Sequence, residues 1–279
     1  MKTRLTPVCP SRHQHRYWRR FTSYDFVRDL SVCPIVENEI PDAAAAFPIA
    51  FQVSGTAIEP VAILSLAPNL PTPFVSDQGE WLATYVPSIL RCAPFHADRL
   101  SRWDEAATTQ FALLVDEASN LISDDPSDQS FFDPDGSLSS ELRQVVEFFK
   151  AHTDARETSR RMCRMIDQLS LFEAMPTDHS VCASFNLMRV RSELIHNLAD
   201  DDITMLTKSG ALRLIHAHQV SLCHLGWLMR AQSNLAKQTP PLPRLEQEPA
   251  LGFLQAMAAS GMREIVDPIE LPAGCSPYA

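Results

Sequence analysis

The sequence is short of glycine and lacks the compact motifs by which many catalytic and nucleotide-binding sites are recognised. Only 8 of the 279 residues are glycine, and no Walker loop, G-x-G-x-x-G, G-x-S-x-G or H-E-x-x-H is present. Because phosphate cradles of the usual kind are built on glycine-rich loops, this composition argues against a nucleotide site. No catalytic residue can be assigned from motifs, and no cofactor or metal is predicted.

Paired cysteine motifs, long apolar runs and an excess of basic residues are also missing. The seven cysteines include no C-x-x-C pair, so reduced and mostly buried thiols are predicted rather than a zinc knuckle. No apolar run is long enough to span a bilayer, and residues 1–20 lack the apolar core of a secretory signal. A net charge of -10 argues against nucleic acid as a partner. The sequence by itself predicts a cytoplasmic protein.

The first half of the chain reads as short strands joined by short links. FPIAFQV (47–53), PVAILSLA (60–67) and TTQFALLVDE (108–117) are strand candidates, and SDQG (76–79) predicts a hairpin turn. A short helix at DAAAA (42–46) should stop at the proline that follows. Consecutive strands without intervening helices indicate an antiparallel sheet.

The second half is predicted to be helical. SSELRQVVEFFKA (139–151) has a serine cap and apolar residues at helical spacing, and the pattern resumes after the polar stretch HTDARETSRR (152–161). MRVRSELIHNL (188–198) and DDITMLTKSG (201–210) look like short helices, and ALRLIHAHQVSLCHLGWLMRAQ (211–232) like one buried helix. The expected fold is α+β, with an antiparallel sheet from the N-terminal half packed against helices of the C-terminal half.

Both ends of the chain are predicted to lie outside this domain, which we place at residues 21–235. Residues 1–20 are rich in arginine and read as a basic flexible arm. The alternative is a basic patch at residues 12–20 that contacts a membrane surface, a phosphate or an acidic partner. Residues 236–279 read as a proline-rich linker and tail.

Three histidines on the last predicted helix suggest a metal site, but helical geometry opposes it. His216 and His218 point about 160° apart, and His216 and His224 are about 12 Å apart along the axis. A single ion needs its ligands within about 2.1 Å. Core or surface histidines are therefore the better interpretation.

Charged side chains supply two further candidate binding sites. Arg156, Arg160 and Arg164 repeat every four residues along one side of a helix. They form either a solvated face or a site for a carboxylate, a phosphate or an acidic partner. Asp116 and Glu117 end a strand, where acid–base chemistry is possible but no nucleophile is identified.

The stretch WLATYVPSILRCAPF (81–95) is the most unusual segment, because aromatics, prolines and one arginine interrupt an apolar run. Trp81, Tyr85 and Arg91 are candidate binding residues. A helical turn should open at the proline of VPSILRC, and Arg91 could then anchor to a carboxylate such as Asp116. Cys92 follows a cation that could lower its pKa, although a buried structural cysteine is the better interpretation.

Within this stretch, Y-V-P-x-x-L-R-x-x-P-F resembles the signature of the SapC family of bacterial proteins. IPDAAAAFPIAF, LLVDE, FFDPDG and SGALRLIHAHQVSL agree in the same order, from about residue 22 to 230. The chain departs from the pattern at Cys92 and Ala93, where a second arginine and an aromatic often stand. The resemblance carries over no catalytic residue.

The resemblance implies a surface-layer-related, accessory role. Family members are described as surface-layer-related and look like companions of outer-membrane receptors and of tailoring enzymes, so a surface-layer protein, a receptor or such an enzyme is the expected partner. We therefore expect a protein that works through protein contacts, with cell-surface association possible despite the cytoplasmic reading. The alternative is an enzyme, or an enzyme partner, acting on a peptide or small molecule in a pocket near Tyr85, Arg91 and Asp116.

Overall fold

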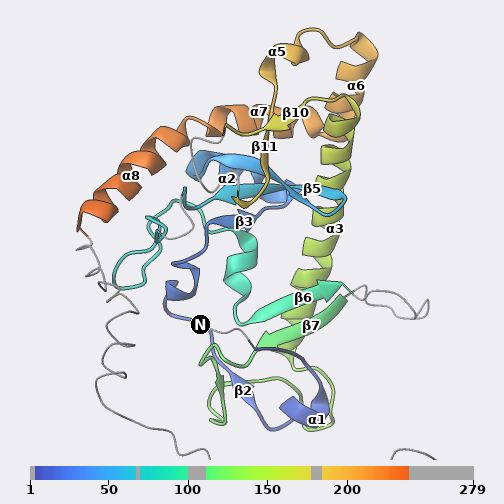
Figure 1. The fold of residues 1–279 in the computed structure, drawn as a ribbon. Helices are drawn as coiled ribbons and strands as arrows, with labels where there is room; N and C mark the ends of the chain where they lie inside the picture. The colour runs from blue at the N-terminus through green and yellow to red at the C-terminus, as the bar shows by residue number, and fades with distance from the viewer. Residues whose placement is uncertain (1–3, 67–69, 100–110, 177–183, 239–279) are drawn as a thin grey trace, which may run out of the picture. The chain divides into compact units, whose positions relative to one another are not determined.

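The computed structural model describes residues 4–66, 70–99, 111–176 and 184–238 (Figure 1). Antiparallel strands dominate the N-terminal half and helices the C-terminal half, so the predicted α+β class is confirmed. The predicted linker and tail, 236–279, lie outside these ranges except for the last residues of the final helix. No helix in the described ranges is long and apolar enough to cross a membrane.

A five-stranded antiparallel sheet forms the first part of the fold. Its spatial order is β10 (Phe172–Ala174), β11 (Leu187–Val190), β4 (Ile49–Ser54), β5 (Ala57–Ile63) and β3 (Val32–Pro34). The β4–β5 hairpin confirms the two apolar strand predictions. Its two-residue turn begins at Gly55, whose φ of +60° favours glycine.

Helices cover this sheet and close the larger of two hydrophobic cores (Figure 1). They are α2 (Ile40–Ala46), α5 (Ser192–Ile195), α6 (Asp200–Ser209), α7 (Ala211–Ser221) and α8 (His224–Gln238). The helix predicted at DAAAA is confirmed as part of α2, which ends before the proline. The helix predicted at DDITMLTKSG is confirmed as α6.

Two helix predictions in this region are wrong. MRVRSELIHNL begins as β11 because its first residues pair with β4 and β10 in the sheet, and only a four-residue helix, α5, follows. The long apolar segment is two helices, because the hydrogen bond of the Cys223 amide shifts to the carbonyl of Val220. It is also not buried all round, since Trp227 and Met229 on α8 are exposed.

One helix, α3 (Ser140–Gln168), runs beside both parts of the fold (Figure 1). The Ser139 side chain caps it by accepting a hydrogen bond from the Leu142 amide. The polar stretch 152–161 does not interrupt the helix, because arginines within it pair with a carboxylate on β5. α3 contacts β5 in the larger sheet and β9 in a smaller one.

The second part contains two small sheets and a core of its own. One sheet has the order β1 (Leu5–Pro7), β7 (Phe111–Asp116) and β6 (Phe95–Arg99). The other has the order β8 (Ile122–Ser123), β2 (Tyr17–Trp18) and β9 (Gln129–Ser130). The predicted strand at 108–117 is confirmed over 111–116. The rings of Trp18 and Phe95 meet edge to face at 4.8 Å in this second core.

The description of residues 1–20 as a flexible arm differs from the structure over residues 4–20. Leu5 pairs with Asp116 and Pro7 with Leu114 in the β1–β7 ladder. Between β1 and β2, residues Pro10–His13 form helix α1. The sequence did not show this, because a strand of three residues and a strand of two residues leave almost no periodic pattern. The many arginines of the segment instead suggested a solvated arm.

Candidate functional site

Tyr85 binds a buried carboxylate, that of Glu39, which the sequence did not reveal, and Trp81 in turn holds Tyr85. Glu39, at the end of the 3₁₀ helix η2 (Glu37–Glu39), is only 4% exposed. Its oxygens accept hydrogen bonds from the Tyr85 hydroxyl at 2.6 Å, the Ser88 amide at 2.8 Å and the Ser88 hydroxyl at 3.1 Å. The Val36 amide donates a fourth at 2.9 Å. Trp81 Nε1 in turn donates to the Tyr85 carbonyl at 2.7 Å.

This network anchors the unusual stretch 81–95 to the start of α2. Burial, followed by the hydrogen bond to Glu39, raises the pKa of Tyr85, so its hydroxyl stays a donor. The predicted helical turn is confirmed as the 3₁₀ helix η3 (Ser88–Cys92), which starts directly after Pro87. Burial raises the pKa of Cys92 to about 12, which leaves its thiol unreactive.

Arg91 does not anchor to Asp116, as the sequence had suggested. Asp116 Oδ1 instead accepts hydrogen bonds from the amides of Arg4 at 2.8 Å and Ala118 at 3.0 Å. Arg91 is exposed, with its guanidinium carbon 6.0 Å from the centre of the Tyr85 ring. Tyr85, Arg91 and Asp116 therefore do not converge on one pocket.

Arg91 does line a groove of about 610 Å³ between β2, η3 and the first turns of α3. Five aromatic side chains line this groove: Trp18, Phe21, Tyr24, Phe95 and Phe148. Arg20 is its second cation, and Glu141 stands in the same wall. Within the described residues, neither guanidinium group forms an ion pair or a hydrogen bond, and that of Arg91 makes only the contact with the Tyr85 ring. We call this surface the arginine–aromatic groove.

The arginine stripe on α3 is paired with carboxylates, although Arg156 and Arg164 remain exposed at its surface. Arg156 Nη2 donates to Glu59 Oε2 at 2.8 Å, Arg156 Nε to Glu59 Oε1 at 3.1 Å, and Arg160 Nε also donates to Oε1. Burial opposes ionisation of Glu59, but its two arginine partners outweigh that effect and hold its pKa below the usual value. Arg164 pairs with Glu157 at 3.0 Å.

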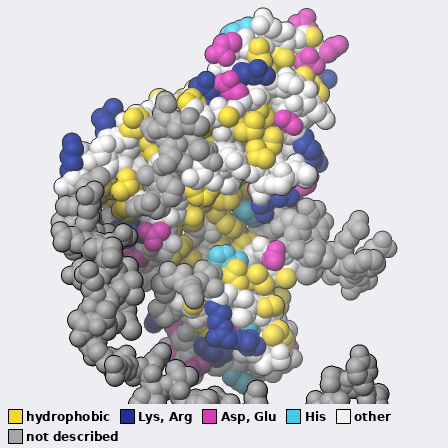
Figure 2. Space-filling model, in the orientation of Figure 1, with side chains coloured by type: hydrophobic (Ala, Val, Ile, Leu, Met, Phe, Trp, Pro, Cys, Tyr) yellow, Lys and Arg dark blue, Asp and Glu magenta, His cyan; other side chains and the backbone are white. Residues whose placement is uncertain are grey.

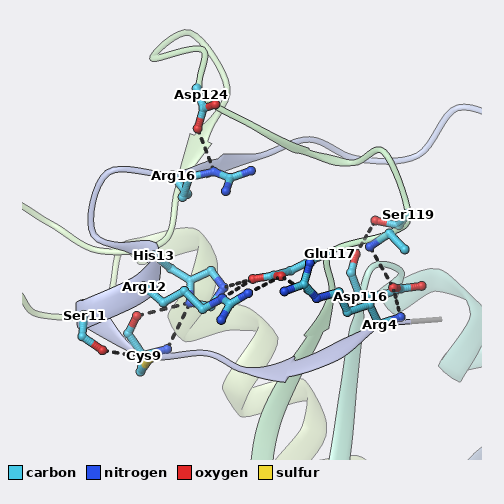
Figure 3. Close-up of polar contacts among 11 residues, drawn as sticks. Arg4, Cys9, Ser11, Arg12, His13, Arg16, Asp116, Glu117, Ser119 and Asp124 are labelled. Carbon is cyan, nitrogen blue, oxygen red and sulfur yellow. Dashed lines mark hydrogen bonds and ion pairs between the residues drawn. The ribbon is translucent and has the colours of Figure 1, made fainter. Parts of the chain in front are cut away.

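Asp116 and Glu117 tie the N-terminal segment to the end of β7 (Figure 3). Arg12 forms a bidentate pair with Glu117, with Nε 2.5 Å from Oε1 and Nη2 2.7 Å from Oε2. Arg4 Nε and His13 Nε2 lie 3.6 Å and 3.5 Å from the same carboxylate. The hydrogen bonds from Arg12 lower the pKa of Glu117 to about 2. A carboxylate held in this way cannot serve as a general base near neutral pH.

The three histidines of the C-terminal helices do not converge. His218 is fully buried, with Nδ1 2.8 Å from the Ile49 carbonyl and Nε2 accepting a hydrogen bond from the Val190 amide at 3.2 Å. His224 Nε2 lies 3.2 Å from the Ala44 carbonyl. Burial lowers the pKa of His218 to about 4. These contacts join the helices to the sheet and to α2.

Sequence reasoning missed several residues that define these sites. Glu39 and Glu59 were not singled out because each lies far along the chain from its partners. Arg20 was assigned to the flexible arm, and Trp18 with it. A signal for Trp18 was present, since a tryptophan is seldom left in a solvated terminus.

The SapC family model matches residues 9–228, so the match begins within the segment that the sequence resemblance had left out. A search of the curated proteins finds no match, and neither does a search of the solved structures. Because the family model covers well over half of the 279 residues, the chain belongs to the SapC family.

Proposed function

We propose that this chain is an accessory protein of the cell envelope or surface layer that binds a partner protein through the arginine–aromatic groove. One observation carries the proposal. Arg20 and Arg91 are the two cations of a groove lined by aromatic rings, and neither has a carboxylate partner among the described residues. By contrast, Arg12, Arg156 and Arg160 are each paired with a carboxylate.

The chemistry of the groove favours an acidic segment of the partner that also carries aromatic or apolar side chains. Guanidinium groups bind carboxylates in a planar, two-pronged geometry, and aromatic walls give apolar side chains a rigid contact surface. Aromatic residues and arginine are also the residues that most often dominate the binding energy of protein interfaces. Since the chain has a net charge of -10, long-range attraction to an acidic partner must come from a local cationic surface such as this one.

The contacts of the other candidate residues support binding rather than catalysis. The Tyr85 hydroxyl is committed to Glu39, and Asp116 to the amides of Arg4 and Ala118. Glu117 is held by Arg12. The proposed pocket of the enzyme alternative thus has no free general base among these residues.

Membrane contact through residues 12–20 has less support than protein contact. Arg12 forms an ion pair with Glu117, with Nε 2.5 Å from Oε1, and Arg16 forms one with Asp124, with Nε 2.7 Å from Oδ1. Arg19 donates to the carbonyl of Asn120 at 3.0 Å. Figure 2 shows basic side chains gathered on the lower part of this face, with acidic ones close by. Anionic lipid is therefore tested as a competing outcome.

The test measures the binding of a defined peptide by fluorescence anisotropy. The probe is a fluorescein-labelled peptide in which Asp or Glu alternates with Phe or Tyr, and its counterpart carries Lys at each acidic position. We expect the Arg20→Ser/Arg91→Ser variant to bind the acidic peptide with an affinity lowered about tenfold or more, because its charge-assisted hydrogen bonds are lost. Arg230→Ser removes an exposed arginine on α8 and is the matched control.

Three results would contradict the proposal. They are equal binding of the lysine peptide, an unchanged affinity in the double variant, and binding of phosphatidylserine vesicles in place of the peptide. The envelope role has a separate test in cells, with a photo-crosslinking amino acid at Gln144 in the groove wall or at Arg230 outside it. We expect one envelope protein to be captured from position 144 and not from position 230.

A further inference from the structure

A second cleft, separate from the arginine–aromatic groove, lies where η3, β6 and α3 meet. It consists of two cavities of about 290 Å³ and 180 Å³ that share Ile89, Ala97, His152 and Arg156 in their walls. Ile89 packs against both hydrophobic cores, so the cleft lies between them. The larger cavity is at the lower end of the size range of small-molecule sites, which is about 300–1,000 Å³. We call this feature the inter-core cleft.

The cleft contains the guanidinium group of Arg156, which is held in place by a carboxylate on β5. Glu59, in the smaller cavity, fixes the guanidinium of Arg156 through Nε and Nη2. Arg156 nevertheless remains 45% exposed, and its Nη1 has no partner among the described residues. A guanidinium with one edge fixed and the other edge free is pre-organised for an acceptor group.

A histidine and an apolar wall complete the cleft. The His152 ring stacks on Phe148 with centroids 5.6 Å apart, and its Nε2 has no hydrogen-bond partner within the described chain. Burial lowers the pKa of His152, so the ring is neutral near pH 7. Phe111 and Phe149, whose rings are tilted by 53° to each other, provide the apolar side of the larger cavity.

We propose that the inter-core cleft binds a small monocarboxylate with an apolar body. The carboxylate would accept hydrogen bonds from Arg156, and the body would lie against the phenylalanine wall. The walls carry Arg156 and Arg160 together with Glu59, Asp154 and Glu157, and Arg164 pairs with Glu157. Because these positive and negative charges balance, a second negative charge on the ligand would be unfavourable, so the cleft favours a monocarboxylate over a phosphate dianion. This inference does not depend on the proposed function.

The test compares three probes by NMR titration of the whole chain. Benzoate carries the predicted group, benzamide has the same shape without the charge, and inorganic phosphate has more charge without the apolar body. We expect benzoate to change the chemical shifts of the His152 ring in a saturable way. Benzamide should bind at least about tenfold more weakly, and phosphate should not bind.

Two variants place the binding in the cleft. Ala97→Met narrows both cavities while keeping Glu59 and its two arginines in the sequence, and it should abolish the benzoate shifts. Arg156→Gln should weaken benzoate by about tenfold or more, and Ala97→Met provides the decisive result if that variant does not fold. Arg20→Ser/Arg91→Ser should bind benzoate as the wild type does.

The proposal is overturned by any of four results. Benzoate and benzamide could bind equally, or benzoate could fail to saturate. Ala97→Met could also leave the benzoate affinity unchanged. Shifts that disappear in the Arg20→Ser/Arg91→Ser variant would move the carboxylate site to the groove and likewise refute the cleft.

Discussion

Replacing Glu39 by glutamine should destabilise the fold far more than the loss of one surface charge would. The Glu39 carboxylate accepts four hydrogen bonds, two at each oxygen. A glutamine side chain has one acceptor oxygen, so two of the four donors would face its NH₂ group instead. At about 1–1.5 kcal/mol for each lost bond, the free energy of unfolding should fall by about 3 kcal/mol.

Tyr85→Phe provides the second arm of a double-mutant cycle. It removes only the 2.6 Å hydrogen bond from the Tyr85 hydroxyl to Glu39 Oε2, which should cost about 1.5 kcal/mol. Because the two side chains are in direct contact, the double variant should be less destabilised than the sum of the single ones. We expect a coupling energy of about 1 kcal/mol.

The assay is urea denaturation followed by tryptophan fluorescence, with Glu37→Gln as the matched control. Glu37 lies on the same 3₁₀ helix, but its contact is a 3.4 Å bond to the exposed Arg213. Its replacement should change stability by less than about 1 kcal/mol. The reasoning is refuted if Glu39→Gln matches this control, or if the Glu39 and Tyr85 changes are additive.

Two further predictions concern stability. The pKa of His218 is about 4 in the fold, against about 6.5 when unfolded, so the unfolded chain takes up the proton first. Stability should therefore fall as the pH drops through this window, by about 2 kcal/mol between about pH 7.5 and about pH 5, and His218→Gln should lose that part of the acid slope. Glu117→Gln removes the carboxylate that holds Arg12, so hydrogen exchange at the β1 amides should become several-fold faster while that of β4 is unchanged. Equal acceleration in both strands would show that Glu117 acts on global stability instead.

Much of the fold could be predicted because its signals are local. The proline in the first turn of α2 and the one after its end, the turn at Gly55 and the serine cap of α3 each fix a boundary within a few residues. The left-handed residue Gly210 ends α6 in the same way. Signals of this kind do not require knowledge of the partner.

The candidate sites could not be predicted because their contacts are long-range. Glu59 and Arg156 are 97 residues apart, and Arg4 and Asp116 are 112 apart. The four-residue spacing of the arginines on α3 indicated a common face but not what that face meets. The break near Cys223 was missed for a related reason, since an apolar pattern does not show where a helix changes its hydrogen bonding.

The contacts of Glu39 also bear on the arginine–aromatic groove. Ser88, which Glu39 holds through both its amide and its hydroxyl, is the first residue of η3, and Arg91 is in the last turn of that helix. Arg91 has no carboxylate partner in the described chain, so its position depends on the position of η3. Glu39 is therefore a positioning residue for the groove, although it does not line it. The buried Glu39 carboxylate holds η3 in place, and η3 in turn sets the position of the exposed Arg91 guanidinium.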